Sequence, residues 1–316
     1  MSQDPSCPPS APMDTAERKR RRRRALAALL ALPALLLAYL LSGCANGAFY
    51  YPDRVDYGSP ARFGLKYEEV TFASGDGTKL HGWFLPAQGP ARGTVIHFHG
   101  NAQNLSSHLA FVEWLPAQGF NVFAFDYRGY GRSEGKPGRR GTIEDGAAAI
   151  AYVQSRRDVD PKRLLVLGQS LGGAVAIATL GGHRYEGVRA VAIDSAFSSY
   201  RGAARDVVAR VPVLGWLRWP IVFMAISGGY DPEDVVAKIA PAPLLLIHGT
   251  ADRVVDSRHS ERLYERAAAP KDLILLDGAG HTQAFASPGP MRKTLVEFYL
   301  QALGGATGDK KNPAKE

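Results

Sequence analysis

The sequence contains little cysteine. Its 316 residues include two, Cys7 and Cys44, and both lie close to the N-terminus. Two cysteines in these positions do not form the disulfide framework that holds many small secreted domains together. The sequence also shows no cluster of metal-ligating residues, no phosphate-binding loop and no dinucleotide fingerprint. We therefore expect an activity that uses neither a metal ion nor a cofactor.

A basic surface of the kind that binds nucleic acids is lacking as well. The formal net charge is +8, but residues 1–43 hold seven basic and three acidic residues, so half of the excess lies in one N-terminal run. The remainder does not predict a nucleic-acid partner. With 46% apolar and 22% charged residues, the chain is typical of a soluble globular protein, and its length suits one large α/β domain with an appendage.

The first 43 residues have the organisation of an export signal. A basic block at 18–24 precedes 17 uncharged residues at 25–41, which are mostly Leu and Ala. A basic region, an apolar region and small residues before a cleavage point are typical of a secretory signal peptide. The segment Leu41–Cys44 reads Leu-Ser-Gly-Cys and resembles the lipobox of bacterial lipoproteins. The resemblance implies cleavage before Cys44 and lipidation of that cysteine.

An uncleaved N-terminal anchor is the alternative, because 17 residues are at the short limit for a membrane-spanning helix. In both cases a domain is tethered to a membrane, and the arginine block places it on the exported side. We therefore expect a lipid-anchored protein on the periplasmic or extracellular face of a bacterial membrane. Residues 44–65 show no periodicity and are predicted to be a tether, and residues 304–316 are predicted to be a disordered tail.

Residues 66–303 alternate between strand and helix patterns. Strands are predicted at 68–72, 79–85, 94–98, 120–125, 164–167, 188–193, 243–247 and 273–276, and helices at 106–118, 143–156, 174–178, 257–268 and 291–302. This alternation predicts an α/β fold with a mostly parallel eight-stranded sheet and helices on both of its faces. The turn at 74–77 makes a hairpin of the first two strands, which gives the sheet an antiparallel edge.

The alternation breaks between residues 196 and 240. The segment 211–226 is too apolar for a surface loop and is interrupted by Pro212 and Pro220. We interpret it as a short helical insert over the ends of the strands. Two interpretations stay open: a helix buried against the domain, or a cap that lines a pocket for an acyl or aromatic substrate.

A candidate nucleophile lies in residues 164–173, which read Leu-Leu-Val-Leu-Gly-Gln-Ser-Leu-Gly-Gly. Four consecutive apolar residues predict a strand buried on both faces, and the apolar run after the motif begins a helix. Gly-x-Ser-x-Gly between a strand and a helix is typical of a nucleophile elbow, where small residues let the strand and the helix pass closely. Gly168 and Gly172 meet that requirement, so Ser170 is the candidate nucleophile.

A serine nucleophile needs a base, and the base needs an acid that orients it. In this architecture the acid and then the base follow the serine along the chain. His281 is the candidate base because it lies directly after the last predicted strand, next to Gly280. His248 is expected to belong to a strand, and His183 and His259 are expected to be solvated.

Asp252 is the candidate acid. It follows the seventh predicted strand, and its spacing of 29 residues to His281 holds one helix and one strand, which returns both loops to the same end of the sheet. Asp194, at the end of the sixth strand, is the rival, because some hydrolases place the acid there. Asp256 fits better at the beginning of a helix as its N-cap.

Two backbone N–H groups are expected to stabilise the negative charge that develops on the substrate carbonyl. One belongs to Leu171, directly after the candidate nucleophile. The other is expected in the loop after the third strand, where Gly100 permits a sharp turn and the N–H of Asn101 is the candidate donor. His99 is expected to fix this loop by hydrogen bonds rather than to transfer protons.

Five segments, in this order, resemble the α/β-hydrolase fold and most closely its serine-aminopeptidase-like and Bem46-like branch. They are His99–Ala102, Asp126–Ser133, Gly168–Gly172, His248–Asp252 and Gly280–His281. The resemblance covers residues 66–303 and implies that Ser170, Asp252 and His281 are nucleophile, acid and base. Members of this branch include esterases, acylglycerol lipases and acyl-protein thioesterases.

The loop that begins at Asp126 allows two interpretations. It leaves the same end of the sheet as the candidate nucleophile, so it could contact substrate. We favour a structural role, in which a buried ion pair between Asp126 and Arg128 fixes the loop.

The sequence therefore predicts a membrane-tethered serine hydrolase that cleaves carboxylic ester or thioester bonds through a Ser-His-Asp triad and an acyl-enzyme. Its expected partners are a small acyl ester or thioester substrate and, through the lipidated N-terminus, a membrane. A peptidase or amidase is the first alternative, but it needs a charged subsite for a peptide terminus, which the sequence does not show. A non-catalytic lipoprotein that uses the fold for binding is the second, and the complete set of Ser, Asp and His argues against it.

Overall fold

The computed structural model describes residues 44–210 and 218–304, together with residues 16, 19–25, 30, 31, 33, 35 and 39. Most of the predicted signal peptide therefore lies outside the described residues. The same holds for residues 211–217 of the predicted cap and for residues 305–316 of the predicted tail. Among the described residues, no helix combines the length and the apolar character that crossing a membrane requires.

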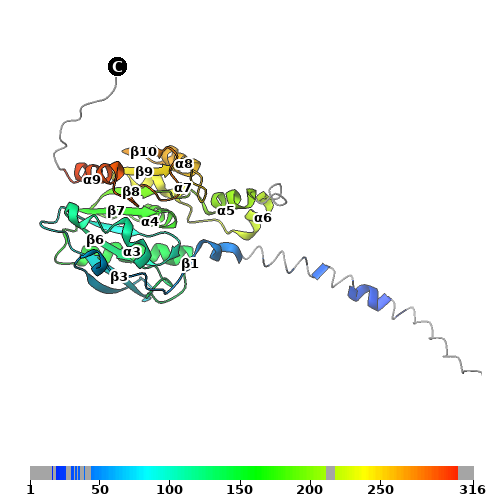
Figure 1. The fold of residues 1–316 in the computed structure, drawn as a ribbon. Coiled ribbons are helices and arrows are strands. Elements are labelled where there is room, and N and C mark those ends of the chain that lie inside the picture. The colour runs from blue at the N-terminus through cyan, green and yellow to red at the C-terminus, as the bar shows by residue number, and fades with distance from the viewer. Residues whose placement is uncertain are drawn as a thin grey trace, which may run out of the picture.

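An eight-stranded sheet forms the centre of the molecule, in the order β10-β9-β8-β7-β4-β6-β3-β2 (Figure 1). Its strands are β2 (Glu68–Ala73), β3 (Lys79–Leu85), β4 (Gly93–Phe98), β6 (Phe120–Phe125), β7 (Leu164–Gln169), β8 (Val188–Asp194), β9 (Leu244–Gly249) and β10 (Lys271–Leu276). β3 is antiparallel to both of its neighbours, and the other adjacent pairs are parallel. The predicted mostly parallel sheet of eight strands is confirmed.

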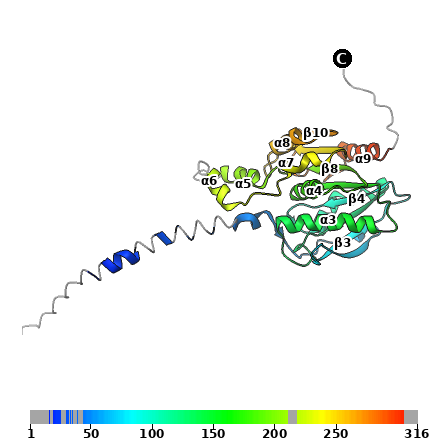
Figure 2. The same ribbon diagram turned by 180° about the vertical axis from the view of Figure 1, so that it is seen from behind.

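Helices cover both faces of the sheet (Figure 2). α3 (Arg139–Ser155), α4 (Leu171–Gly182) and α8 (Arg258–Arg266) pack on one face, and α9 (Pro290–Ala302) packs on the other with residues 105–118. Because both faces are covered, β4, β6, β7 and β9 are buried at every residue. This burial explains why these strands are largely continuous apolar runs instead of alternating apolar and polar residues.

The continuous helix predicted at 106–118 is wrong. The chain instead forms a short helix, α2 (Leu105–His108), followed by the 3-10 turns η3 (Leu109–Phe111) and η4 (Pro116–Gln118). Pro116 has no N–H to donate, so a helix that continued through it would lose a backbone hydrogen bond.

Residues 44–65, predicted to be a tether, pack against the domain. They contain the 3-10 helix η1 (Cys44–Phe49), the two-residue strand β1 (Tyr51–Pro52) and the turn η2 (Pro60–Phe63). β1 pairs in parallel with β5 (Ala102–Gln103), which directly follows the loop after β4. The beginning of the domain therefore lies beside the carboxyl end of β4.

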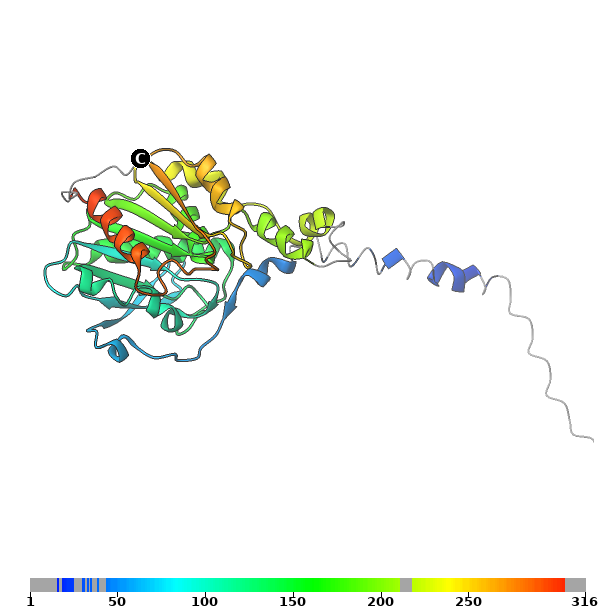
Figure 3. The same ribbon diagram turned by 45° about the horizontal axis from the view of Figure 1, so that its top comes forward.

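The described part of the insert between β8 and β9 is helical. α5 (Tyr200–Ala209) and α6 (Arg218–Ala225) project from the carboxyl ends of the strands and lie beside η1 in every view (Figures 1, 2 and 3). α7 (Pro232–Val235) and the turn η6 (Val236–Ile239) then return the chain to β9. The insert and η1 together stand over one end of the sheet.

Candidate active site

Ser170 lies on a constrained turn between β7 and α4. Its backbone has φ +52° and ψ −120°, a conformation that residues with a side chain rarely adopt. Its N–H donates a hydrogen bond to the carbonyl oxygen of Asp194 (2.8 Å). The turn also requires Gly172, because a Cβ at that position would lie 2.1 Å from the carbonyl oxygen of Phe98. The Gly-x-Ser-x-Gly spacing thus matches a real close approach of α4 to β4.

His281 contacts both of the side chains predicted to accompany it. It follows β10, and Asp252 follows the neighbouring strand β9. The Nε2 of His281 lies 2.9 Å from the Oγ of Ser170, and its Nδ1 lies 2.6 Å from the Oδ2 of Asp252. Because a carboxylate only accepts hydrogen bonds, Nδ1 donates, and Nε2 of the neutral ring can accept the hydroxyl proton of Ser170. The three side chains have the arrangement of a Ser-His-Asp triad.

The carboxylate of Asp252 is buried and hydrogen-bonded at both oxygens. Oδ1 accepts from the N–H groups of Val254 (2.7 Å) and Val255 (3.0 Å), and Oδ2 also lies 3.2 Å from the Nε2 of His248. Burial by itself would raise the pKa of Asp252. Hydrogen bonds from His248, His281 and the backbone nevertheless hold that pKa well below its usual range. Asp252 is therefore ionised at neutral pH and accepts the hydrogen bond that orients the ring of His281.

Asp194, the rival candidate for the acid, makes its hydrogen bonds with Ser195 and Gln169 instead of His281. The Ser195 hydroxyl donates to Asp194 (2.9 Å) and accepts from the N–H of Thr282 (3.1 Å), the residue after His281. Burial raises the pKa of Asp194 to about 6, although the hydrogen bonds from Ser195 and Gln169 oppose the increase. Asp194 thus supports the loop that carries His281, while Asp252 contacts its ring.

Histidines outside this arrangement have structural positions or lie at the surface. His248 is buried in β9, as predicted, and His183 is exposed after α4. The prediction that His259 is solvated is wrong. Its buried ring lies between α8 and the insert, with Nδ1 2.9 Å from the Oγ of Ser198 and Nε2 3.1 Å from Asp206. The charged sequence of α8 concealed this burial because the partners of His259 come from a distant segment.

Asn101 and Leu171, the predicted oxyanion donors, line the same cavity as Ser170. Leu171 is the first residue of α4, so its N–H has no acceptor within the helix. The carbonyl oxygen of Asn101 accepts hydrogen bonds from the N–H of Tyr51 (3.0 Å) and the hydroxyl of Tyr130 (2.8 Å). These two bonds fix the loop after β4 beside the serine, so both predicted donors are held next to it.

The ion pair predicted between Asp126 and Arg128 is wrong. Arg128 pairs with Asp145 of α3 (2.8 Å), whereas Asp126 accepts from the N–H of Leu105 (2.7 Å) and lies 3.4 Å from the Nε2 of His99. Arg128 thus contacts α3, whereas Asp126 contacts the first residue of α2 and the loop after β4. His99 also donates from Nδ1 to the carbonyl oxygen of the next residue (2.8 Å), so its contacts are those of a residue that fixes the loop.

An apolar cavity of about 450 Å³ opens at Ser170. Its walls come from α5 and α6, from the segment after β9 and from η1, which contributes Phe49. Val222 and Ile226 of the insert are buried and also line the cavity. The described part of the insert is thus buried against the domain and also lines a cavity, while an acyl or aromatic occupant of that cavity stays a prediction. No pattern in residues 44–49 predicts that η1 forms another wall of the cavity.

Hydrogen bonds and ring contacts hold η1 in this position. The side-chain oxygen of Asn46 accepts from Arg139 of α3 (2.8 Å), and its NH₂ group donates to the Oγ of Ser227 after α6 (2.8 Å). Phe49 packs edge-on against Tyr200 of α5, with ring centroids 4.9 Å apart. Arg139 also stacks on Tyr200, 4.0 Å from the ring centroid. The N-terminal segment, the insert and α3 are thereby tied together.

Comparison with known proteins places the chain in a family. The family described as serine aminopeptidase, S33, matches residues 89–235 and 217–285. The uncharacterized protein YfhR of Escherichia coli O157:H7 is 44% identical over 271 residues, which are 84% of this chain and 90% of YfhR. The chain belongs to the serine aminopeptidase S33 family. Members of the family are hydrolases, and so is this protein.

Two further similarities agree with this assignment. The alpha/beta hydrolase domain-containing protein WAV2 of Arabidopsis thaliana is 34% identical over 67% of this chain and 70% of its own. The solved structure of the Pyrococcus furiosus esterase Pf2001 has a TM-score of 0.66 and 26% identity, and covers 81% of this chain and 98% of that one. The fold of this S33 protein is the α/β-hydrolase fold.

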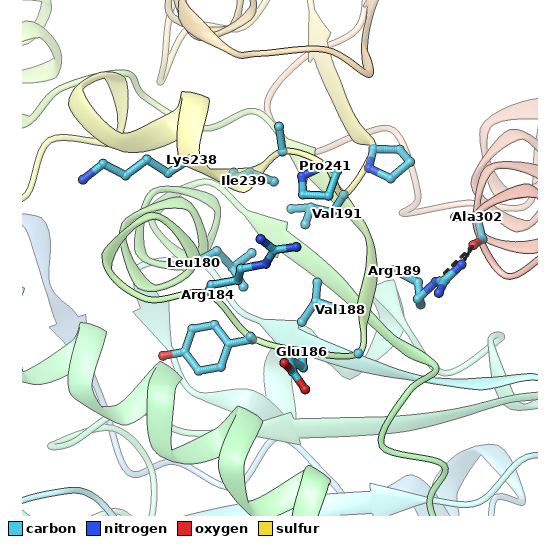
Figure 4. Close-up of a pocket in the computed structure, with 15 residues that line it drawn as sticks. Leu180, Arg184, Glu186, Val188, Arg189, Val191, Lys238, Ile239, Pro241 and Ala302 are labelled. Carbon is cyan, nitrogen blue, oxygen red and sulfur yellow. Dashed lines mark hydrogen bonds between the residues drawn. The ribbon is translucent and has the colours of Figure 1, made fainter.

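A larger cavity, of about 790 Å³, lies where β8 and β9 begin, at the opposite end of the sheet from the triad. Figure 4 shows the side chains that line it. Arg184, Glu186 and Lys238 surround it, and Arg189 turns towards α9 to donate to the carbonyl oxygen of Ala302 (3.2 Å). Among the described residues that line it there is no serine, cysteine or histidine. Within the described part of the chain, no group of three His, Cys, Asp or Glu side chains is placed to hold a metal ion. Ser170 with His281 and Asp252 therefore remains the candidate site of this S33 protein.

We predict that Asp194→Asn changes how stability depends on pH. The raised pKa means that the folded protein holds the Asp194 proton more tightly than the unfolded chain does. Ionisation of Asp194 therefore lowers the free energy of unfolding as the pH rises through about 6. Between pH 5 and pH 8 the wild type should lose about 1 kcal/mol relative to Asp194→Asn in urea denaturation.

The control is Asp272→Asn, which removes an exposed carboxylate from β10 and should follow the wild type. If Asp194→Asn and the wild type changed equally between the two pH values, Asp194 would not carry a raised pKa.

Proposed function

We propose that the protein is a membrane-tethered serine hydrolase that cleaves carboxylic ester or thioester bonds through an acyl-enzyme. The observation that carries the proposal is that one histidine, His281, hydrogen-bonds both Ser170 and Asp252. That arrangement supplies a nucleophile, a base and an oriented acid at the mouth of an apolar cavity.

The reaction begins when the Oγ of Ser170 attacks the acyl carbonyl carbon while Nε2 of His281 takes the hydroxyl proton. The N–H groups of Asn101 and Leu171 stabilise the oxyanion of the tetrahedral intermediate, at roughly 3 kcal/mol for each donor. Ionised Asp252 stabilises the imidazolium. His281 then returns the proton to the leaving oxygen or sulfur, which leaves the acyl group on the serine. Water attacks this ester by the same route, and the free acid departs.

The two cavities that border Ser170 suggest where the two parts of the substrate bind. The apolar cavity of about 450 Å³ suits the acyl group, and it lies within the range of roughly 300–1,000 Å³ typical of small-molecule sites. A smaller cavity, of about 170 Å³, is lined by His108, Phe111 and His281. Because His281 must protonate the leaving group, the smaller cavity is the place for that group.

Ester or thioester cleavage fits the apolar cavity better than peptide cleavage. None of the described side chains that line the cavity of about 450 Å³ is charged, so none of them can pair with a peptide terminus. The likeness to the Pyrococcus furiosus esterase points the same way. A peptidase or amidase is the second candidate, and the description of the S33 family as serine aminopeptidases favours it.

We predict that a fluorophosphonate probe labels the wild-type protein and does not label Ser170→Ala. The probe phosphonylates a serine only when a base activates it. The matched control is Ser155→Ala, which removes an exposed serine at the end of α3 and should leave labelling unchanged. The measurement is in-gel fluorescence, followed by rates on an octanoyl ester, thioester and amide. The ester and thioester should be cleaved much faster than the amide.

Labelling that persisted in Ser170→Ala would refute the nucleophile. A wild type that took no label would support a non-catalytic binding protein, and faster cleavage of the amide would support the peptidase.

The membrane tether is a separate part of the proposal and rests on the segment Leu41–Cys44. We predict that bacteria grown with labelled palmitate incorporate the label into the wild type and not into Cys44→Ala. Cys7→Ala is the control, because Cys7 precedes the proposed cleavage point and should not affect labelling. Label that survived in Cys44→Ala would exclude a lipobox, and the uncleaved anchor would then be the better interpretation.

A further inference from the structure

The insert exposes large apolar side chains to solvent. Val207 of α5 is 56% exposed, and Trp219 and Phe223 of α6 are 61% and 64% exposed. We call these three residues the cap patch. Exposed large aromatic side chains that gather on one element are typical of a surface that contacts a partner or a membrane.

Arginines of α5 hold the two rings of the cap patch in place. The guanidinium of Arg205 lies 4.1 Å from the ring centroid of Trp219, and that of Arg201 lies 4.4 Å from the ring centroid of Phe223. The two arginines are four residues apart on α5, and the two rings are four residues apart on α6. The two contacts therefore lie one helical turn apart between α5 and α6. Aromatic rings next to arginine, on a helix with apolar side chains facing outward, are characteristic of the membrane interface.

One residue of the cap patch, Val207, also lies at the mouth of the apolar cavity of about 450 Å³. We call this cavity the acyl cavity, because the proposed function places the acyl group in it. Val207 is both exposed and part of the cavity lining, and so are Tyr51 and Val254. A chain that entered between these residues would pass along apolar side chains until it reached Ser170. Val207 therefore belongs both to the cap patch and to the cavity that borders Ser170.

The N-terminus leads to the same surface. η1 is joined to the end of α6 through the Asn46–Ser227 hydrogen bond, and it begins only three residues after the apolar run 25–41. The described apolar residues Leu30 and Leu35 in that run are exposed. Figure 3 shows the described N-terminal residues leaving the domain on the side of α5 and α6. A membrane that holds the N-terminus, through a lipid on Cys44 or through this run if it is not cleaved, is thus within reach of the cap patch.

We infer that the cap patch rests on the bilayer that holds the N-terminus, and that the substrate is an acyl ester of a lipid in that bilayer. This inference depends on the proposed function, because it assigns a source to the acyl group that Ser170 accepts. The lipid's chain passes from the bilayer between Val207 and Tyr51 into the cavity, with its ester at the serine. The positive charges of Arg201 and Arg205 favour a bilayer with anionic headgroups.

The test uses the full chain, reconstituted into vesicles of phosphatidylethanolamine and phosphatidylglycerol. Two substrates share one leaving group: 4-methylumbelliferyl oleate, incorporated into the vesicles, and water-soluble 4-methylumbelliferyl butyrate. The variant Trp219→Ser with Phe223→Ser should hydrolyse the oleate about tenfold more slowly and the butyrate at the wild-type rate, because only the oleate must enter from the bilayer. Phe63→Ser is the control, since Phe63 is also exposed and stacked with an arginine, Arg62, but belongs to η2 and not to the cap patch.

A second measurement does not depend on activity. Brominated lipid in the vesicles should quench the fluorescence of Trp219, and Trp219→Phe should lose that part of the quenching. Equal loss on both substrates, or quenching that is unchanged in Trp219→Phe, would overturn the inference. Failure of the proposed function gives a different result: the wild type would hydrolyse neither substrate, while the quenching would still report whether the patch meets the bilayer.

Discussion

The catalytic site depends on how closely α4 approaches the end of β4. A Cβ on Gly172 would lie 2.1 Å and 2.3 Å from the carbonyl oxygens of Phe98 and His99, so only glycine allows the contact. The same turn holds Ser170 at a positive φ, which costs on the order of 1–3 kcal/mol and persists because the surrounding structure fixes it. The turn also brings the N–H of Leu171 to the cavity that Asn101 lines. The candidate nucleophile and both candidate oxyanion donors therefore border the same cavity.

The central parts of the site could be predicted because they follow from local patterns and sheet geometry. The apolar run of β7 and the glycines around Ser170 identify the turn without any distant contact. His281 and Asp252 each follow a strand, and parallel strands bring the loops at their carboxyl ends together. The choice between Asp252 and Asp194 was harder, because the two residues follow adjacent strands. Hydrogen bonds decide it: Asp252 contacts the ring of His281, and Asp194 supports its loop.

What could not be predicted depends on partners far away in the sequence. η1 becomes a wall of the acyl cavity because Asn46 meets Arg139 and Ser227, 93 and 181 residues later. Arg128 likewise pairs with Asp145, 17 residues later, instead of with the nearby Asp126. The contacts of Asn46 also hold the N-terminal segment beside the insert, which is the basis for the proposed orientation of the cap patch towards the membrane. η1, which follows the proposed membrane anchor, lies with the insert and the apolar cavity at the triad's end of the sheet. In the proposed orientation an acyl chain reaches Ser170 without crossing water.

The most direct test of this mechanism is to find the acyl group on Ser170 during turnover. A p-nitrophenyl ester has a good leaving group, so acylation should outpace hydrolysis and an acyl-enzyme should accumulate in the first burst of product. The measurement is peptide mass analysis of the full chain after an acid quench during that burst. The mechanism predicts one acyl adduct, on the peptide that contains Ser170. Release of p-nitrophenol with no adduct at Ser170, or with the adduct on another residue, would contradict it.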